Sequence, residues 1–174
     1  MQYKLTTPCT AEDLAPLKAG DTVLLSGVVY TARDQAHKRM LEALDKGDKL
    51  PFDLEGPGEI IGSAGPTTSG RMDAMSPRLL DLGNKIMIGK GKRDAAVKEA
   101  VVRNGAVYLA ALGGAGALMA QSVKTLEVIA WPDLGCEAVR RLTVEDMPLT
   151  VILDAHGGDL YLSGPEAYRE AQVK

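Results

Sequence analysis

Short runs of β-branched and aliphatic residues alternate with helix-like stretches through the middle of the chain, and this alternation limits the possible folds more than any other feature. Residues 85–88, 106–112 and 126–130 have the character of strands, whereas residues 93–104 and 115–123 have helical spacing. Consecutive strands that are joined by helices pair in parallel. The middle of the chain therefore predicts an α/β layer with parallel strands.

The same pattern extends toward the N-terminus. Thr10 is followed three residues later by Asp13, which indicates the start of a short surface helix. Residues 21–31, DTVLLSGVVYT, predict a strand that leads straight into a helix over residues 33–46, and residues 73–83 predict another helix. These segments add further strand and helix units to the α/β layer.

The remaining segments have a different character. Residues 49–70 are rich in Gly and Pro and leave room for a short strand only at residues 59–62. Residues 142–163 predict two strands joined by a tight turn at residues 156–158, and a short polar helix is expected near residues 166–172. The predicted fold class is therefore α/β, a mixed sheet with parallel crossovers and a C-terminal antiparallel addition.

The composition limits the partners and the cofactors of the chain. Its 174 residues are 45% hydrophobic and 25% charged, as in ordinary globular proteins, and we expect a single domain over residues 1–174. The formal net charge of -3 argues against nucleic acid as the main partner. Cys9 and Cys136 are the only cysteines, too few for a zinc site or an iron–sulfur ligand set within this chain. No segment has the length of a membrane span or the apolar core of a secretory signal, so we expect a cytoplasmic protein.

The segment GPTTSGRMD, residues 65–73, is the most informative candidate for a binding site. Gly65, Pro66 and Gly70 allow tight turns that leave backbone N–H groups pointing at a ligand. The helix that follows adds the positive end of its dipole, and Arg71 adds a planar guanidinium able to grip a carboxylate with two hydrogen bonds. These features predict an anion site, and the alternative is a Ser/Thr-rich turn that only caps the helix.

Two other segments place basic side chains at the ends of predicted strands. In IGKGKR, Lys90 lies between two glycines at the strand end where open α/β sheets bind ligands, and the alternative is a solvated basic turn. In TARDQAH, Arg33 marks the junction of strand and helix, where pairing with Asp34 and exposure to solvent are both open. His37 lies one turn later, and we expect it on the helix surface rather than in catalysis.

Taken in order, five segments of this sequence resemble a known family. They are YTARDQAHKRMLEAL, GEIIGSAGPTTSGRMD, IMIGKGKR, VYLAALGGAGALMAQSVK and WPDLGCEAVRRLTVEDMP. Together they resemble the C-terminal domain or β subunit of class I, iron–sulfur-dependent fumarate hydratases, from about Thr6 to Tyr161. The resemblance implies a swivelling β/β/α domain. The chain lacks the aromatic, YYVGP-like strand that relatives carry before the GSAGPTT segment.

The resemblance also implies roles for particular residues. Arg33, Arg71 and Lys90 match the family's ligands for the substrate carboxylates, and Thr67 matches the position proposed as the catalytic base. The cofactor implied is a [4Fe-4S] cluster that three cysteines of an α subunit hold, so this chain would contribute neither cofactor nor metal ligands. The partner implied is that Fe–S α subunit, in a heterotetramer, and the isolated chain is expected to self-associate.

The function implied is that of an iron–sulfur hydro-lyase. The GRMD and VEDMP segments favour fumarate hydratase, which interconverts fumarate and L-malate in the tricarboxylic acid cycle. Two alternatives stay open at this point. One is the β subunit of L-tartrate dehydratase, whose β subunits differ at these two places. The other is a lone anion-binding module without catalysis.

Overall fold

Strands and helices alternate along the chain as the sequence predicts, but the strand predicted at residues 126–130 pairs antiparallel with a later strand and not in parallel. The structure is a computed structural model that describes residues 1–52, 60–61, 68–111 and 116–172. The elements within these ranges are, in order, β1 (Gln2–Thr6), α1 (Ala11–Leu14), β2 (Thr22–Thr31), α2 (Asp34–Asp45), β3 (Ile60–Ile61), the 3-10 helix η1 (Ser69–Met72), α3 (Ser76–Asp81), β4 (Ile86–Gly89), α4 (Ala95–Arg103), β5 (Val107–Ala110), α5 (Gly116–Ser122), β6 (Val123–Ala130), the 3-10 helix η2 (Pro132–Glu137), β7 (Val139–Leu153) and α6 (Leu160–Gln172).

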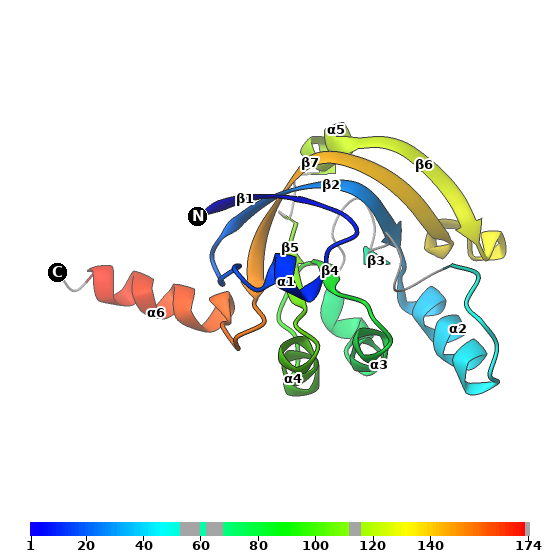
Figure 1. Cartoon of the computed structure of the whole chain (residues 1–174), viewed down its shortest axis with the longest axis horizontal. Coiled ribbons are helices and arrows are strands. Elements are labelled where there is room, and N and C mark those ends of the chain that lie inside the picture. Colours follow the sequence, from blue (N-terminus) through cyan, green and yellow to red (C-terminus); the bar gives the residue numbers. More distant parts are fainter. Residues whose placement is uncertain (53–59, 62–67, 112–115, 173–174) are drawn as a thin grey trace.

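The strands lie in two layers, and helices cover the second layer (Figure 1). The arched first layer consists of β1, β2, β7 and β6, in which β1 and β2 are parallel while β7 runs antiparallel to both β2 and β6. The second layer consists of β3, β4 and β5, all parallel, with α3 and α4 side by side beneath it. This mixed β/β/α architecture confirms the predicted fold class.

Two strands of the first layer also pair with strands of the second layer and close the two layers into a ring. β2 pairs with β3 through Tyr30 and Thr31, and β7 pairs with β5 through Leu153 and its neighbours. Because β2 and β7 also pair with each other, the strands β2, β3, β4, β5 and β7 form a closed circuit, with β1 and β6 at the free edges. The parallel strands β2, β3, β4 and β5 therefore all end at one edge of the ring.

Successive side chains of the second layer point to opposite faces and pack into two different hydrophobic cores. Ile86 and Ile88 of β4 point into the core between the two strand layers, whereas Met87 packs toward the helices. In β5, Tyr108 likewise faces α4. A strand that is buried on both faces has apolar residues at consecutive positions, which is why residues 86–88 form an uninterrupted apolar run.

The C-terminal third differs from the prediction of two strands joined by a tight turn. One long strand, β7, occupies residues 139–153, and the turn that follows leads into α6. Asp159 starts this helix, because its carboxylate accepts a hydrogen bond from Tyr161 N–H at 2.9 Å and its carbonyl accepts one from Leu162 N–H at 3.0 Å. The helix thus begins before the predicted residues 166–172 and extends away from the body (Figure 1). Neither α6 nor any other helix of the described ranges is long and apolar enough to cross a membrane.

Candidate functional site

Arg33 lies two residues after the end of β2, at the edge where the parallel strands end. It is the N-cap residue of α2, and its extended backbone turns the chain from strand to helix. One guanidinium nitrogen lies 3.8 Å from a carboxylate oxygen of Glu137, and its buried Nε has no hydrogen-bond partner. The sequence left two alternatives for Arg33, pairing with Asp34 or exposure to solvent. In the structure its partner is instead Glu137, from a distant segment of the chain.

Glu137, the last residue of η2, also caps α2 from outside the helix. Arg33 has no side-chain oxygen that could accept a hydrogen bond from the first turn, and its side chain makes no cap. Instead, Glu137 Oε2 accepts a hydrogen bond from Gln35 N–H at 3.2 Å. Glu137 thus holds both the start of the helix and the side chain of Arg33. Sequence reasoning missed this residue, because no local pattern connects it to α2.

Arg71 lies in η1, next to the start of α2. Its Nε lies 3.5 Å from Oδ2 of Asp34, the first residue of α2, which directly follows Arg33. Both side chains are partly exposed, so the ion pair itself contributes little to stability. Its importance is geometric, because it places the segments of Arg33 and Arg71 side by side. The structure thus brings together two arginines that the sequence predicts from separate motifs.

Lys90 follows the last residue of β4 and joins the same edge of the ring. Its carbonyl accepts a hydrogen bond from Ser69 N–H at 2.9 Å, and Thr68 forms an isolated parallel bridge with Lys90. This close approach requires the glycine that precedes the lysine, because a Cβ atom on Gly89 would lie 1.8 Å from Ser69 Oγ. The side chain of Lys90 is exposed to solvent.

We name Arg33, Arg71 and Lys90 the cationic site. The segments that carry them meet at the C-terminal edge of parallel strands, which is where open α/β sheets bind ligands. Guanidinium groups match the planar geometry of a carboxylate, and the lysine adds a point charge on a flexible stem. The arrangement suits a small ligand with two negative charges. Asp34 and Glu137 contribute to it as resident partners of the two arginines.

His37 lies inside the protein, and the expectation of a surface histidine is wrong. It is 5% exposed, and its Nδ1 lies 3.0 Å from the carbonyl oxygen of Arg33, to which the neutral ring donates. Burial lowers the pKa of His37 to about 4, although the hydrogen bond to the Arg33 carbonyl acts in the opposite direction. The ring lines a small cavity together with Ser69, Asn84 and Arg93. His37 therefore supports the backbone of Arg33 as a neutral, buried donor.

Thr67, the residue expected to act as the base, lies outside the residues that the structure describes. The described chain resumes at Thr68, immediately before η1. The role of Thr67 therefore stays a prediction, supported by the resemblance of the GPTTSGRMD segment.

The part of the chain that the structure describes offers no metal site. No group of three or more His, Cys, Asp or Glu side chains within it is arranged to hold a metal ion. Cys9 immediately precedes the N-cap of α1, whereas Cys136 lies in η2. A cluster that needs three thiolates does not fit a chain with two cysteines.

Comparison with known proteins gives relatives of two kinds, and the first kind has nearly the length of this chain. A protein of Methanocaldococcus jannaschii named "Putative L(+)-tartrate dehydratase subunit beta" is 40% identical over 170 residues, and the match covers 87% of each chain. The L(+)-tartrate dehydratase subunit beta of Escherichia coli is 31% identical, and the match covers 98% of this chain and 92% of that protein.

The second kind of relative is a longer protein. The aerobic class I fumarate hydratase of Escherichia coli is 38% identical over 151 residues, which are 79% of this chain and 28% of that protein. The chain therefore spans less than a third of the fumarate hydratases it matches. The family model described as Fumarase C-terminus matches residues 1–164. Because this match covers nearly the whole sequence, the chain belongs to the Fumarase C-terminus family.

Proposed function

We propose that the chain is the β subunit of an iron–sulfur hydro-lyase and that its cationic site binds the two carboxylates of a small substrate. The observation that carries this proposal is the convergence of the Arg33, Arg71 and Lys90 segments at one edge of the sheet. The family match supports it, and so do the names of the relatives.

In this proposal the cationic site both binds the substrate and stabilises charge that develops during the reaction. Fumarate and malate are dianions, and Arg33 and Arg71 can each present two N–H donors to one carboxylate. When malate loses a proton from carbon, negative charge moves onto the adjacent carboxylate. Cations held beside that carboxylate, with Lys90 among them, stabilise the charged species more than the ground state.

The [4Fe-4S] cluster of such an enzyme belongs, in this proposal, to a partner α subunit. Two relatives that match over most of their length are named as beta subunits, which implies a second subunit. The two cysteines of this chain are too few to hold the cluster. The complete active site would therefore lie between two kinds of chain, in a heterotetramer to which this chain brings the cations.

We propose fumarate and L-malate as the substrate pair, because the GRMD and VEDMP segments resemble those of fumarate hydratases. L-tartrate is the second candidate. The observation that favours it is the extent of the match, since the tartrate dehydratase β subunits match this chain over 87% and 92% of their own sequences.

Thr67 is the proposed proton acceptor in either reaction. A comparison of Thr67→Val, which lacks the hydroxyl, with Thr67→Ser, which keeps it, tests this role in the same assay.

The test of the proposed function is turnover by this chain assembled with its α subunit. We expect the complex to hydrate fumarate and dehydrate L-malate. We expect Arg71→Ala or Lys90→Ala to lower kcat/KM roughly 30- to 1,000-fold, because each removes one charge-assisted contact to a carboxylate worth about 2 to 4 kcal/mol. The measurement is steady-state kinetics with malate and with tartrate.

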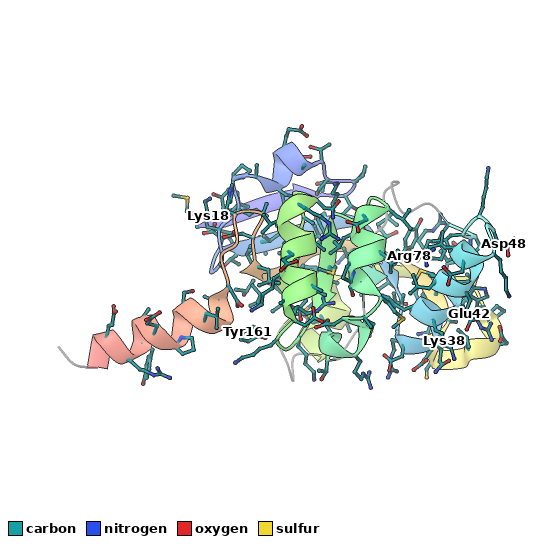
Figure 2. The ribbon with its side chains drawn as sticks, turned by 90° about the horizontal axis from the view of Figure 1, so that it is seen from below. Lys18, Lys38, Glu42, Asp48, Arg78 and Tyr161 are labelled. Atoms are coloured by element: carbon teal, nitrogen blue, oxygen red, sulfur yellow. The ribbon has the colours of Figure 1, made fainter. Side chains whose placement is uncertain are left out.

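Matched control variants distinguish the cationic site from general surface charge. Arg78→Ala removes an arginine that is as exposed as Arg71 and also pairs with one aspartate, and Lys38→Ala removes an exposed lysine (Figure 2). Both controls should keep wild-type kinetics. Turnover of tartrate but not malate would establish the second candidate, and dicarboxylate binding without turnover of either would identify an anion-binding module.

A further inference from the structure

A buried ion pair joins the segment after η1 to the start of α4. The side chain of Arg93 is 2% exposed, and its Nε donates to Asp73 Oδ1 at 2.6 Å. The guanidinium also donates to Ser76 Oγ at 2.7 Å and lies 5.0 Å from the centre of the Tyr108 ring. The second oxygen of Asp73 accepts a hydrogen bond from Asp94 N–H at 2.7 Å. Both charges of the pair are therefore hydrogen-bonded as well as buried.

Tyr108 connects the same two segments a second time. Its hydroxyl lies 3.2 Å from Ser69 Oγ in η1 and 3.1 Å from the carbonyl oxygen of Gly91 in the loop after β4. Burial raises the pKa of Tyr108 to about 12, so the hydroxyl keeps its proton and can donate it in a hydrogen bond. Gly91 N–H in turn donates at 3.1 Å to the hydroxyl of Tyr161, where α6 meets the body (Figure 2).

These contacts fix the two segments that carry Arg71 and Lys90. Asp73 follows Arg71 by two residues, and Arg93 follows Lys90 by three. We propose that Asp73, Arg93 and Tyr108 form a positioning clamp that sets the separation of Arg71 and Lys90, and thereby the fit of the substrate carboxylates. The clamp rests on the proposed function, because its purpose is the geometry of that site. Its three members are positioning residues, since they act through Arg71 and Lys90.

Stability alone is a weak explanation for a buried pair of this kind. Removing two charges from water costs about as much free energy as their attraction returns, so apolar residues of similar volume stabilise a core equally well. A guanidinium–carboxylate pair differs from an apolar contact because its hydrogen bonds fix both the distance and the angle between the two groups. That property is useful where two cations must face one ligand, since a displacement of about 1 Å is enough to weaken catalysis.

The test uses this chain assembled with its α subunit and compares two clamp variants with a control. Tyr108→Phe removes only the hydroxyl and keeps the ring in the core, whereas Asp73→Asn removes the charge of the pair. Asp154→Asn is the matched control, because Asp154 is also a buried carboxylate that accepts backbone hydrogen bonds, in another part of the fold. The readouts are KM, kcat and the hydrogen exchange of Ser69 N–H, which donates to the Lys90 carbonyl.

We expect both clamp variants to raise KM roughly tenfold and to accelerate exchange at Ser69. When either clamp substitution is added to Arg71→Ala, KM should rise by less than about twofold over that of Arg71→Ala alone. The reason is that the clamp no longer has the Arg71 guanidinium to position. Asp154→Asn should lower the melting temperature and leave KM and Ser69 exchange unchanged, since a loss of folded enzyme reduces only the apparent kcat.

Three results would overturn the clamp. They are an unchanged KM in Tyr108→Phe, an equal rise of KM in Asp154→Asn, and a rise of KM that persists in full in the Arg71→Ala background. Tyr108→Phe decides the question if Asp73→Asn does not fold. If the complex turns over neither malate nor tartrate, the proposed function fails, and exchange at Ser69 in Tyr108→Phe still confirms or overturns the clamp.

Discussion

The buried ring of His37 makes the stability of this protein depend on pH. Its pKa is about 4 in the folded state and 6.5 in the unfolded chain, so between these values only the unfolded chain binds the proton. The stabilisation is complete above pH 6.5 and is lost as the pH falls toward 4. We expect the free energy of unfolding to fall by about 2 to 3 kcal/mol between pH 7 and pH 4.5 for this reason. In His37→Asn, urea unfolding at the two pH values should show a difference smaller by that amount.

His156 provides the control for this experiment. It is the only other histidine of the chain, and it is exposed. The same urea experiment on His156→Asn measures the contribution of this second histidine separately. A His37→Asn variant with the wild-type pH dependence would instead show that other groups cause it.

Individual residues of the candidate site differ in how far the sequence predicts them. Arg33, Arg71 and Lys90 stand in motifs where small residues, strand ends and basic side chains coincide, so local reasoning singles them out as candidates. Glu137 escapes such reasoning, because it acts on the start of a helix 102 positions away in the chain. Burial of His37 is equally invisible locally, since the face of α2 that packs inward is decided by the strands beneath it.

The start of α2 depends on the cap that Glu137 supplies from η2. Glu137→Ala should lower the free energy of unfolding by about 1 kcal/mol, because Gln35 N–H loses its acceptor. Glu137→Gln keeps an acceptor oxygen and should cost about half as much or less. Urea unfolding at pH 7 measures both changes.

Glu145→Ala is the control, because Glu145 is an exposed partner of Lys124 and its loss should change stability by less than about 0.5 kcal/mol. Equal losses in Glu137→Gln and Glu137→Ala would contradict the cap. Such a result would mean that Glu137 stabilises the protein through its charge interaction with Arg33.

Elements with a strong period are predicted from the sequence, and elements that depend on tertiary contacts are not. β2, α2, β4, α4 and β5 are confirmed, because each has an apolar pattern long enough to identify. β1 escapes prediction, since its five residues show only a short alternation and owe their structure to pairing with β2. The start of α6 is missed because Gly157 and Gly158 suggest a hairpin, whereas Asp159 initiates a helix.

At the scale of the whole molecule, the sequence contains two cysteines, fewer than the three that the proposed cluster would need. We expect anaerobic reconstitution of this chain alone with iron and sulfide to yield no stoichiometric cluster and no malate turnover, because two cysteines cannot replace three. Calorimetry should still detect dicarboxylate binding at the cationic site. The measurements are iron content, malate dehydration and heat of binding. Stoichiometric iron with activity in the isolated chain would contradict the assignment of the cluster to a partner.

The closure of the strand ring has a consequence for synthesis. β2 pairs with β7 from Thr22 opposite Thr150 to Thr31 opposite Arg140, yet β7 begins about 110 residues after β2 ends. At about 5 to 20 residues per second, a ribosome needs roughly 5 to 20 s to make that interval. During this time the backbone N–H and C=O groups on that side of β2 have no strand partner and can pair with other nascent chains. Glu137, the ion-pair partner of Arg33, is made in the same late interval, so Arg33 gains this partner long after its own synthesis.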